Sequence, residues 1–158
     1  AGVSETFWKG RMEIVNENPF FMIDGAHNSH GVWALKGSLE ELYPNEKFHF
    51  IMGVMADKDY EEMIDALLPL AIDFITVTPE SNRALQSRDL AECIQRKGVP
   101  ARFVDNMEIV IRPLLPRGEE SVTSKEGHMD KTIAFGSLYF IGAIEAMLEE
   151  NDKYNYLP

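Results

Sequence analysis

The sequence predicts an α/β protein, a Rossmann-like three-layer α/β/α sandwich built on a mostly parallel sheet of about six strands. Short apolar runs alternate with longer segments of helical period, which is the pattern of βαβ units. Several of these runs pass directly into loops rich in Gly, Asp and Asn. The first two runs are separated by a short turn, so we expect an antiparallel first hairpin and right-handed crossovers after it.

The N-terminal part predicts this hairpin and one helix. Residues 12–15 alternate polar and apolar side chains, and residues 20–23 form a continuous apolar run typical of a buried strand. After Asn28, apolar residues recur with a helical period as far as Pro44. Residues 1–10 have no clear period, and we expect them to form a linker.

The middle of the chain predicts two further βα units. Residues 48–52 and 74–77 are apolar runs typical of strands, and residues 60–68 have a good amphipathic helical period. We expect a helix that Ser87 caps at its N-terminus and that Gly98 ends. A short strand and a short helix should follow, over residues 101–104 and 107–115.

The C-terminal part predicts one more βα unit after a loop. Residues 116–130 are polar, which is typical of a surface loop. Residues 133–135 predict the last strand, and Gly136-Ser137 should lead into a helix. We expect residues 151–158 to form a frayed tail.

Composition limits the classes of function. With 158 residues and 45% apolar content the chain should form one domain over residues 1–158, and its net charge of −11 argues against a nucleic-acid partner. No apolar run approaches the ~18 residues of a membrane-spanning helix. Cys93, the single cysteine, suits a reducing compartment and the core, so we expect a cytoplasmic location. The chain begins without Met, which we expect of a piece of a longer protein.

The clearest candidate site is Asp24-Gly25-Ala26-His27-Asn28, at the carboxyl end of the strand predicted over residues 20–23. Ligands of open α/β sheets bind at that end of the strands. The residues alone leave three interpretations open. The loop could cap the following helix through Asp24 and Asn28, bind a small molecule, or hold a metal ion through Asp24, His27 and His30.

Other polar residues are expected at the same sheet edge. Asp57-Lys58-Asp59 follows the strand predicted over residues 48–52, and Gly136-Ser137 offers N–H groups and a hydroxyl to an anion. Arg11, just before the first strand, could reach a phosphate with its fork of donors. Neither G-x-G-x-x-G nor a P-loop occurs, so the chain predicts a site for an anionic small molecule without its own phosphate-binding fingerprint.

Five segments in register resemble one family. They are Gly10-Arg11, Asp24-Gly25-Ala26-His27-Asn28, Asp57-Lys58-Asp59, Arg83-Ala84-Leu85 and Phe135-Gly136-Ser137-Leu138-Tyr139. Over residues 9–148 the chain resembles the C-terminal domain of folylpolyglutamate synthases and dihydrofolate synthases, in the Mur ligase superfamily. Ser29 departs from the pattern, since many members have Pro there.

The resemblance implies an ATP-dependent amide ligase that activates a folate carboxylate as an acyl phosphate and joins it to L-glutamate, releasing ADP and phosphate. It implies an N-terminal domain that supplies the P-loop and most ligands of Mg²⁺. It also implies nucleotide contacts from Arg11 and Asp24, a catalytic and glutamate-binding role for His27, and a glutamate contact from Ser137. Asn28, Asp57, Lys58 and Asp59 are further candidates.

Two other functions are open at this point. A stand-alone binding module could keep this fold without catalysing ligation, and the absence of a P-loop favours it. A metal-dependent hydrolase could use Asp24, His27 and His30. If the resemblance holds, the isolated chain should bind ATP only very weakly and catalyse nothing.

Overall fold

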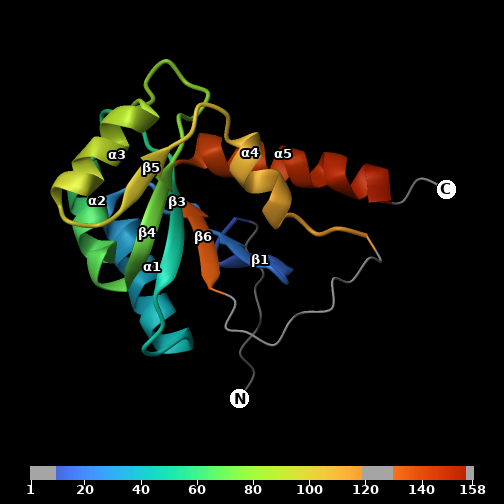
Figure 1. Ribbon diagram of the computed structural model, residues 1–158, viewed down its shortest axis with the longest axis horizontal. Helices are drawn as coiled ribbons and strands as arrows, with labels where there is room; N and C mark the ends of the chain where they lie inside the picture. The colour runs from blue at the N-terminus through green and yellow to red at the C-terminus, as the bar shows by residue number, and fades with distance from the viewer. Residues whose placement is uncertain (1–9, 119–129, 156–158) are drawn as a thin grey trace.

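The computed structural model describes residues 10–118 and 130–155. They form one six-stranded sheet with helices on both faces (Figure 1). Its strands lie in the order β1 (Glu13–Glu17), β2 (Phe20–Ile23), β6 (Lys131–Phe135), β3 (Phe48–Met52), β4 (Ala71–Thr76) and β5 (Ala101–Phe103). β1 is antiparallel to β2, and all other pairs are parallel. The predicted fold class is confirmed.

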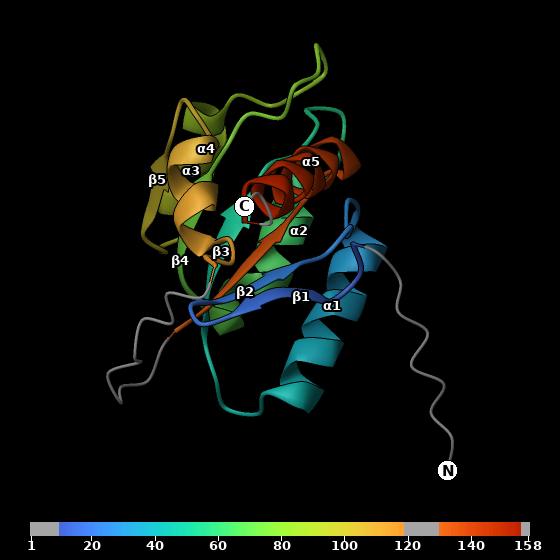
Figure 2. The ribbon, with the colours of Figure 1, turned by 90° about the vertical axis from the view of Figure 1, so that its right-hand side faces the viewer.

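The helices divide between the two faces of the sheet, as Figure 2 shows. One face is covered by α1 (Ser29–Leu42), α2 (Tyr60–Leu67) and α3 (Ser87–Arg96). The other face is covered by α4 (Glu108–Ile111) and α5 (Leu138–Asn155). Two short 3-10 turns, Leu68–Leu70 and Arg112–Leu114, follow α2 and α4. No helix in these two described segments is long and apolar enough to cross a membrane.

The alternation of side chains along each strand produces two cores. In β3, Phe50 faces α1 and α2 whereas the next residue, Ile51, faces α5, and both are buried. The Phe50 ring stacks on Phe74 with 5.3 Å between centroids and meets Phe135 edge-on at 5.7 Å. Such aromatic pairs contribute about 0.5–1.5 kcal/mol each beyond the apolar area they bury. This aromatic cluster joins three neighbouring strands.

Two helix ends differ from the sequence predictions. Ser87 is the first residue of α3 and is buried, while Gln86 occupies the N-cap position without a side-chain cap. Ser87 instead accepts a hydrogen bond from Thr76 Oγ1 at its carbonyl oxygen, 2.7 Å away. α5 continues to Asn155, beyond the point where fraying was expected, and Asn151 Nδ2 donates to the carbonyl of Pro116 at 2.6 Å. Of the loop predicted over residues 116–130, residues 119–129 lie outside the described part of the chain.

The position of β6 determines where a ligand can bind. Although it is the last strand in sequence, β6 lies between β2 and β3. The helices that follow β2 and β6, α1 and α5, leave toward opposite faces of the sheet. Beyond the first residues of the loops after β2 and β6 the chain therefore diverges toward opposite faces, and a divergence of this kind is where open α/β sheets bind their ligands.

Candidate functional site

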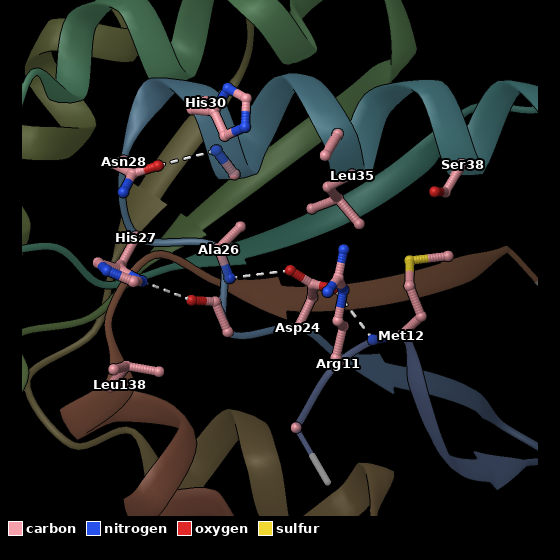
Figure 3. A pocket seen from close by; sticks show the side chains of 14 residues that line it. Arg11, Met12, Asp24, Ala26, His27, Asn28, His30, Leu35, Ser38 and Leu138 are labelled. Atoms are coloured by element: carbon pink, nitrogen blue, oxygen red, sulfur yellow. Dashed lines mark hydrogen bonds between the residues drawn. The ribbon is translucent and has the colours of Figure 1, made fainter. Parts of the chain in front are cut away.

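A cavity of about 530 Å³ opens beside the carboxyl end of β2 (Figure 3). Its walls come from the turn before β1, the loop after β2, α1 as far as Ser38, and the start of α5. The lining residues are Gly10, Arg11, Met12, Asp24, Gly25, Ala26, His27, Asn28, His30, Gly31, Ala34, Leu35, Ser38 and Leu138. Four of the predicted site residues thus line one cavity: Arg11, Asp24, His27 and Asn28.

Asp24 is a buried carboxylate in the wall of this cavity, with 6% of its surface exposed. Its Oδ1 accepts a hydrogen bond from the backbone N–H of Ala26 at 2.8 Å, and its Oδ2 accepts one from Met12 at 3.0 Å. Burial raises the pKa of Asp24 above its ordinary value, while these two N–H groups and the charge of Arg11 act in the opposite direction. Asp24 therefore ties the turn before β1 to the end of β2.

Arg11 supplies the positive charge of the cavity. It is exposed and lies in a turn between Gly10 and Met12, which both have positive φ, at 76° and 48°. Figure 3 shows its side chain beside Asp24 at the cavity. Within residues 10–118 and 130–155 no ion pair involves Arg11. Its guanidinium can therefore act as a fork of donors for a phosphate or carboxylate that enters the cavity.

His27 has a defined tautomer. Its Nδ1 lies 2.9 Å from the carbonyl oxygen of Gly25, and since a carbonyl only accepts, Nδ1 carries the proton. In the neutral ring Nε2 is then an acceptor. Asn28 caps α1, because its Oδ1 accepts a hydrogen bond from Gly31 N–H at 2.8 Å. The predicted capping role is confirmed for Asn28, whereas Asp24 bonds to N–H groups outside the helix.

The interpretation of Asp24, His27 and His30 as a metal site is wrong for the described residues. No group of three or more His, Cys, Asp or Glu side chains that could hold a metal ion occurs among them. The physical reason is that the three side chains do not converge. The Asp24 carboxylate is buried and faces the turn before β1, whereas the exposed His30 side chain lies apart from it on α1 (Figure 3).

Ser137 lies next to the cavity but does not line it. Its side chain is buried, and its Oγ accepts a hydrogen bond from the backbone N–H of Tyr139 at 3.1 Å. The neighbouring Gly136 donates its N–H to the carbonyl of Ala26 at 2.9 Å, so the loops after β2 and β6 are bonded to one another. Ser137 is thus within one residue of Leu138, which does reach the cavity wall.

Asp57, Lys58 and Asp59 also lie outside the cavity lining. Asp57 pairs with Arg83 at 3.6 Å, and Asp59 precedes α2 without a side-chain cap. The loop that carries them is bonded to the loop after β4, because Ala56 N–H donates to the carbonyl of Arg83 at 2.7 Å. These charges form a second polar group at the same sheet edge, beside the loop after β4.

The cavity wall formed by α1 was missed by the sequence reasoning. Gly31, Ala34, Leu35 and Ser38 all line the cavity and recur at helical spacing. The signal was present as a stripe of mainly small residues beside the apolar stripe that predicted the helix. Leu138 was also missed, although it remains 60% exposed at the start of α5.

An open sheet with a cavity at the divergence of two loops is typical of α/β domains that bind small ligands. Residues 10–121 match the family described as Mur ligase, glutamate ligase domain. The match covers well over half of the chain, and the chain belongs to this family.

Two relatives of the chain have names that agree with this family. The chain is 28% identical over 149 residues to the dihydrofolate synthase/folylpolyglutamate synthase of Bacillus subtilis, covering 94% of this chain and 32% of that protein. It is 34% identical over 85 residues to the folylpolyglutamate synthase of Lacticaseibacillus casei, covering 53% and 20%. The chain therefore spans about a third or less of the length of these relatives.

Solved structures share the fold. The Mycobacterium tuberculosis folylpolyglutamate synthase complexed with ADP and AMPPCP has a TM-score of 0.76 at 23% identity, covering 92% of this chain and 33% of that one. Escherichia coli FolC in complex with ADP, without folate substrate, also has a TM-score of 0.76, at 20% identity and with 96% and 34% coverage. At these identities the likeness concerns the fold.

Proposed function

We propose that this chain forms one half of the active site of an ATP-dependent ligase that joins L-glutamate to a folate. Family membership and the names of the relatives support the reaction class. The observation that carries the proposal is the convergence of Arg11, Asp24 and His27 on one cavity at the carboxyl edge of the sheet. The cavity combines a cation, a buried carboxylate and an imidazole acceptor.

We assign the nucleotide to the part of the cavity around Arg11. The guanidinium suits the phosphates, since it can donate two parallel hydrogen bonds to an anion. The wall formed by Ala34 and Leu35 of α1 offers apolar contact to a ring. Asp24 can also accept a hydrogen bond from a ribose hydroxyl, because each carboxylate oxygen that already accepts one N–H has a second lone pair.

We assign the glutamate side to His27 and to the start of α5. His27 Nε2 can accept the proton that the glutamate amine loses when it attacks an acyl carbon. The N-terminus of α5, at Ser137 and Leu138, has the polarity that favours a carboxylate. Asn28 lies on the rim, and Asp57, Lys58 and Asp59 would be reached by a ligand that extends along the sheet edge.

The proposed reaction has two steps. The γ-phosphoryl group of ATP passes to a carboxylate oxygen of the folate, and ADP leaves. The glutamate amine then attacks the acyl carbon, the C–O bond to the phosphate breaks, and inorganic phosphate leaves while the amine gives up a proton. Mg²⁺, when bound to ATP, neutralises phosphate charge. The described residues do not fit a metal ion, so its ligands would come from an N-terminal domain that also holds a P-loop.

The described contacts are too few for function without such a domain. A charge-assisted hydrogen bond that Arg11 donates and one that Asp24 accepts would contribute about 1.5–3 kcal/mol each. Association costs about 4–15 kcal/mol in lost translational and rotational freedom. We therefore propose that the chain alone binds ATP very weakly, and that ligation follows closure of the two domains over the substrates, in the cytoplasm.

The test is ATP-, folate- and glutamate-dependent phosphate release by the full-length ligase with Arg11→Ala. We expect the KM for ATP to rise about ten-fold or more, which corresponds to one lost charge-assisted contact. Arg102→Ala is the matched control, because Arg102 is an exposed arginine on β5, at the opposite edge of the sheet. Phosphate release that does not depend on glutamate, or an unchanged KM in Arg11→Ala, would overturn the proposal.

A further inference from the structure

The turn that carries Arg11 has an unusual backbone. Gly10 and Met12, on either side of Arg11, both have positive φ. Glycine adopts this region readily, but a residue with a Cβ such as Met12 rarely does. A strained conformation of this kind persists only where surrounding contacts determine it. The contacts of this turn therefore decide where the Arg11 side chain points.

Two carboxylates hold the turn, one on each side of Arg11. The N–H of Gly10 donates to Glu13 Oε2 at 2.8 Å, and the N–H of Met12 donates to Asp24 Oδ2 at 3.0 Å. Hydrogen bonds to charged acceptors are about twice as strong as neutral ones. Glu13 is thus the counterpart of Asp24 on the other side of the arginine.

The turn also fits closely against two other elements. A Cβ at Gly10 would lie 3.3 Å from Ile141 Cγ2 of α5, and one at Gly25 would lie 3.3 Å from the Gly10 carbonyl oxygen. These packing contacts limit large shifts of the turn. Loss of the Glu13 bond would leave the N–H of Gly10 without its acceptor, and the turn would then be held by Asp24 and by packing alone.

Glu13 itself does not face the cavity. It lines a separate groove between β1 and α5, together with Ile14, Glu145 and Leu148. Its negative charge therefore lies on the other side of the turn from the place where we assign the phosphates. A direct contact between Glu13 and a bound nucleotide is not part of this geometry.

We propose that Glu13 is a positioning residue, whose carboxylate fixes the Gly10–Met12 turn and thereby directs the Arg11 guanidinium over the cavity toward a polyphosphate anion. The inference rests on the proposed function, because Arg11 must contact the ATP phosphates. Glu13 touches no substrate. It acts through the backbone and through Arg11.

The test is a double-mutant cycle in the full-length ligase with Glu13→Ala and Arg11→Ala. We expect Glu13→Ala to raise the KM for ATP about five- to ten-fold with a smaller change in kcat, and to have no further effect when Arg11 is already Ala. Glu13→Gln keeps an acceptor oxygen and should restore the KM to within about two-fold of the parent. Glu17→Ala, an exposed glutamate at the other end of β1, is the matched control.

A second measurement does not depend on catalysis. Amide hydrogen exchange at Gly10 should accelerate in Glu13→Ala and stay slow in Glu13→Gln and Glu17→Ala. A raised KM in Arg11→Ala together with an unchanged KM in Glu13→Ala would overturn the positioning role and leave the proposed function standing. An unchanged KM in Arg11→Ala would overturn the proposed function itself. A Glu13→Ala effect that persists in the Arg11→Ala background would show that Glu13 acts by another route.

Discussion

The backbone N–H of Met12 donates a 3.0 Å hydrogen bond to Oδ2 of Asp24, twelve residues further along the chain. This bond connects the turn before β1 to the end of β2, where the carboxylate also holds the N–H of Ala26. One buried side chain therefore determines the relative positions of Arg11 and the loop that carries His27. The effect of Asp24 on the free energy of unfolding can be measured without a ligand, and so separately from its effect on ligand binding.

Asp24→Ala should destabilise the chain, because one buried N–H group and one half-buried N–H group lose a charged acceptor. We expect a loss of about 3 kcal/mol, and about half of that for Asp24→Asn, which retains one acceptor oxygen. Urea unfolding of the chain without nucleotide measures both values. Asp105→Ala, at an exposed position, should leave stability within about 0.5 kcal/mol of the parent. An equally small loss of stability in Asp24→Ala would show that these two hydrogen bonds do not stabilise the fold.

His27→Ala should act on the chemical step. We expect kcat of the full-length ligase to fall by about 10²–10⁴-fold, the range for loss of a general base, while the KM for ATP changes little. His30→Ala is the comparison, since His30 lines the same cavity and is exposed at the start of α1. Steady-state rates at saturating glutamate measure kcat for both variants. Equal losses in the two variants would remove the special role of His27.

His49, near the amino end of β3, makes stability depend on pH. Its Nδ1 lies 2.7 Å from Asp73 and its Nε2 lies 3.0 Å from Asp130, and only the protonated ring can donate to both. Burial alone would lower the pKa of His49, but the hydrogen bonds and charges of Asp73 and Asp130 outweigh it and raise the pKa above 6.5.

Because the pKa of His49 is raised in the folded state, folding stability should fall as pH rises. The contribution of His49 is fully present below the unfolded-state pKa and is lost as pH rises through the higher folded-state pKa. Urea midpoints measured from about pH 6 to pH 8.5 should therefore fall more steeply for the parent than for His49→Gln. Asp130→Asn should lie between the two. A variant His49→Gln with the same slope as the parent would refute this account.

Gly136→Ala should be strongly destabilising. Gly136 has a φ of 121°, and a Cβ there would lie 2.3 Å from the carbonyl oxygen of Gly53 on the neighbouring strand end. We expect a loss of at least about 3 kcal/mol in urea unfolding. Gly37→Ala is the control, because Gly37 is in α1 with nothing within 4 Å of the added Cβ. That variant should gain about 0.5–1 kcal/mol.

Ala34→Phe should narrow the cavity from its α1 wall. Ala34 is exposed and lines the cavity, so a Phe ring at this position should leave the fold intact but occupy space that a bound ligand needs. We expect the KM for ATP in the full-length ligase to rise on the order of ten-fold, equivalent to about 1.4 kcal/mol. Glu41→Phe, an exposed position on α1 outside the cavity lining, should leave the KM unchanged. Equal values for both variants would place the nucleotide elsewhere.

The strands and helices were predictable because their patterns are local. Phe50 and Ile51 belong to a run whose apolar character is enough to bury a strand, whichever residues it meets. Ser87 shows where local reasoning fails. A Ser just before a run of helical period is a favoured N-cap residue. Ser87 instead lies buried inside the first turn of α3, where its carbonyl oxygen accepts a hydrogen bond from Thr76 Oγ1.

The site was predictable in part, for a similar reason. Asp24, His27 and Asn28 adjoin in sequence, so a single strand end brings them together. The pairing of Asp24 with Met12 and of Glu13 with Gly10 depends on turn geometry, which composition does not specify. The burial of Ser137 and the distance of Lys58 from the cavity follow from how loops at neighbouring strand ends are bonded to one another.

The position of β6 has a consequence for the order of events during synthesis. Until residues 131–135 have emerged from the ribosome, the strand pairs of the folded sheet that can form are those of the two-stranded hairpin β1–β2 and of the separate three-stranded sheet β3–β4–β5. An isolated hairpin is at best marginally stable in water. The apolar edges of β2 and β3 stay unpaired during that interval, and nascent chains stalled before residue 131 should be exposed to aggregation and to chaperones.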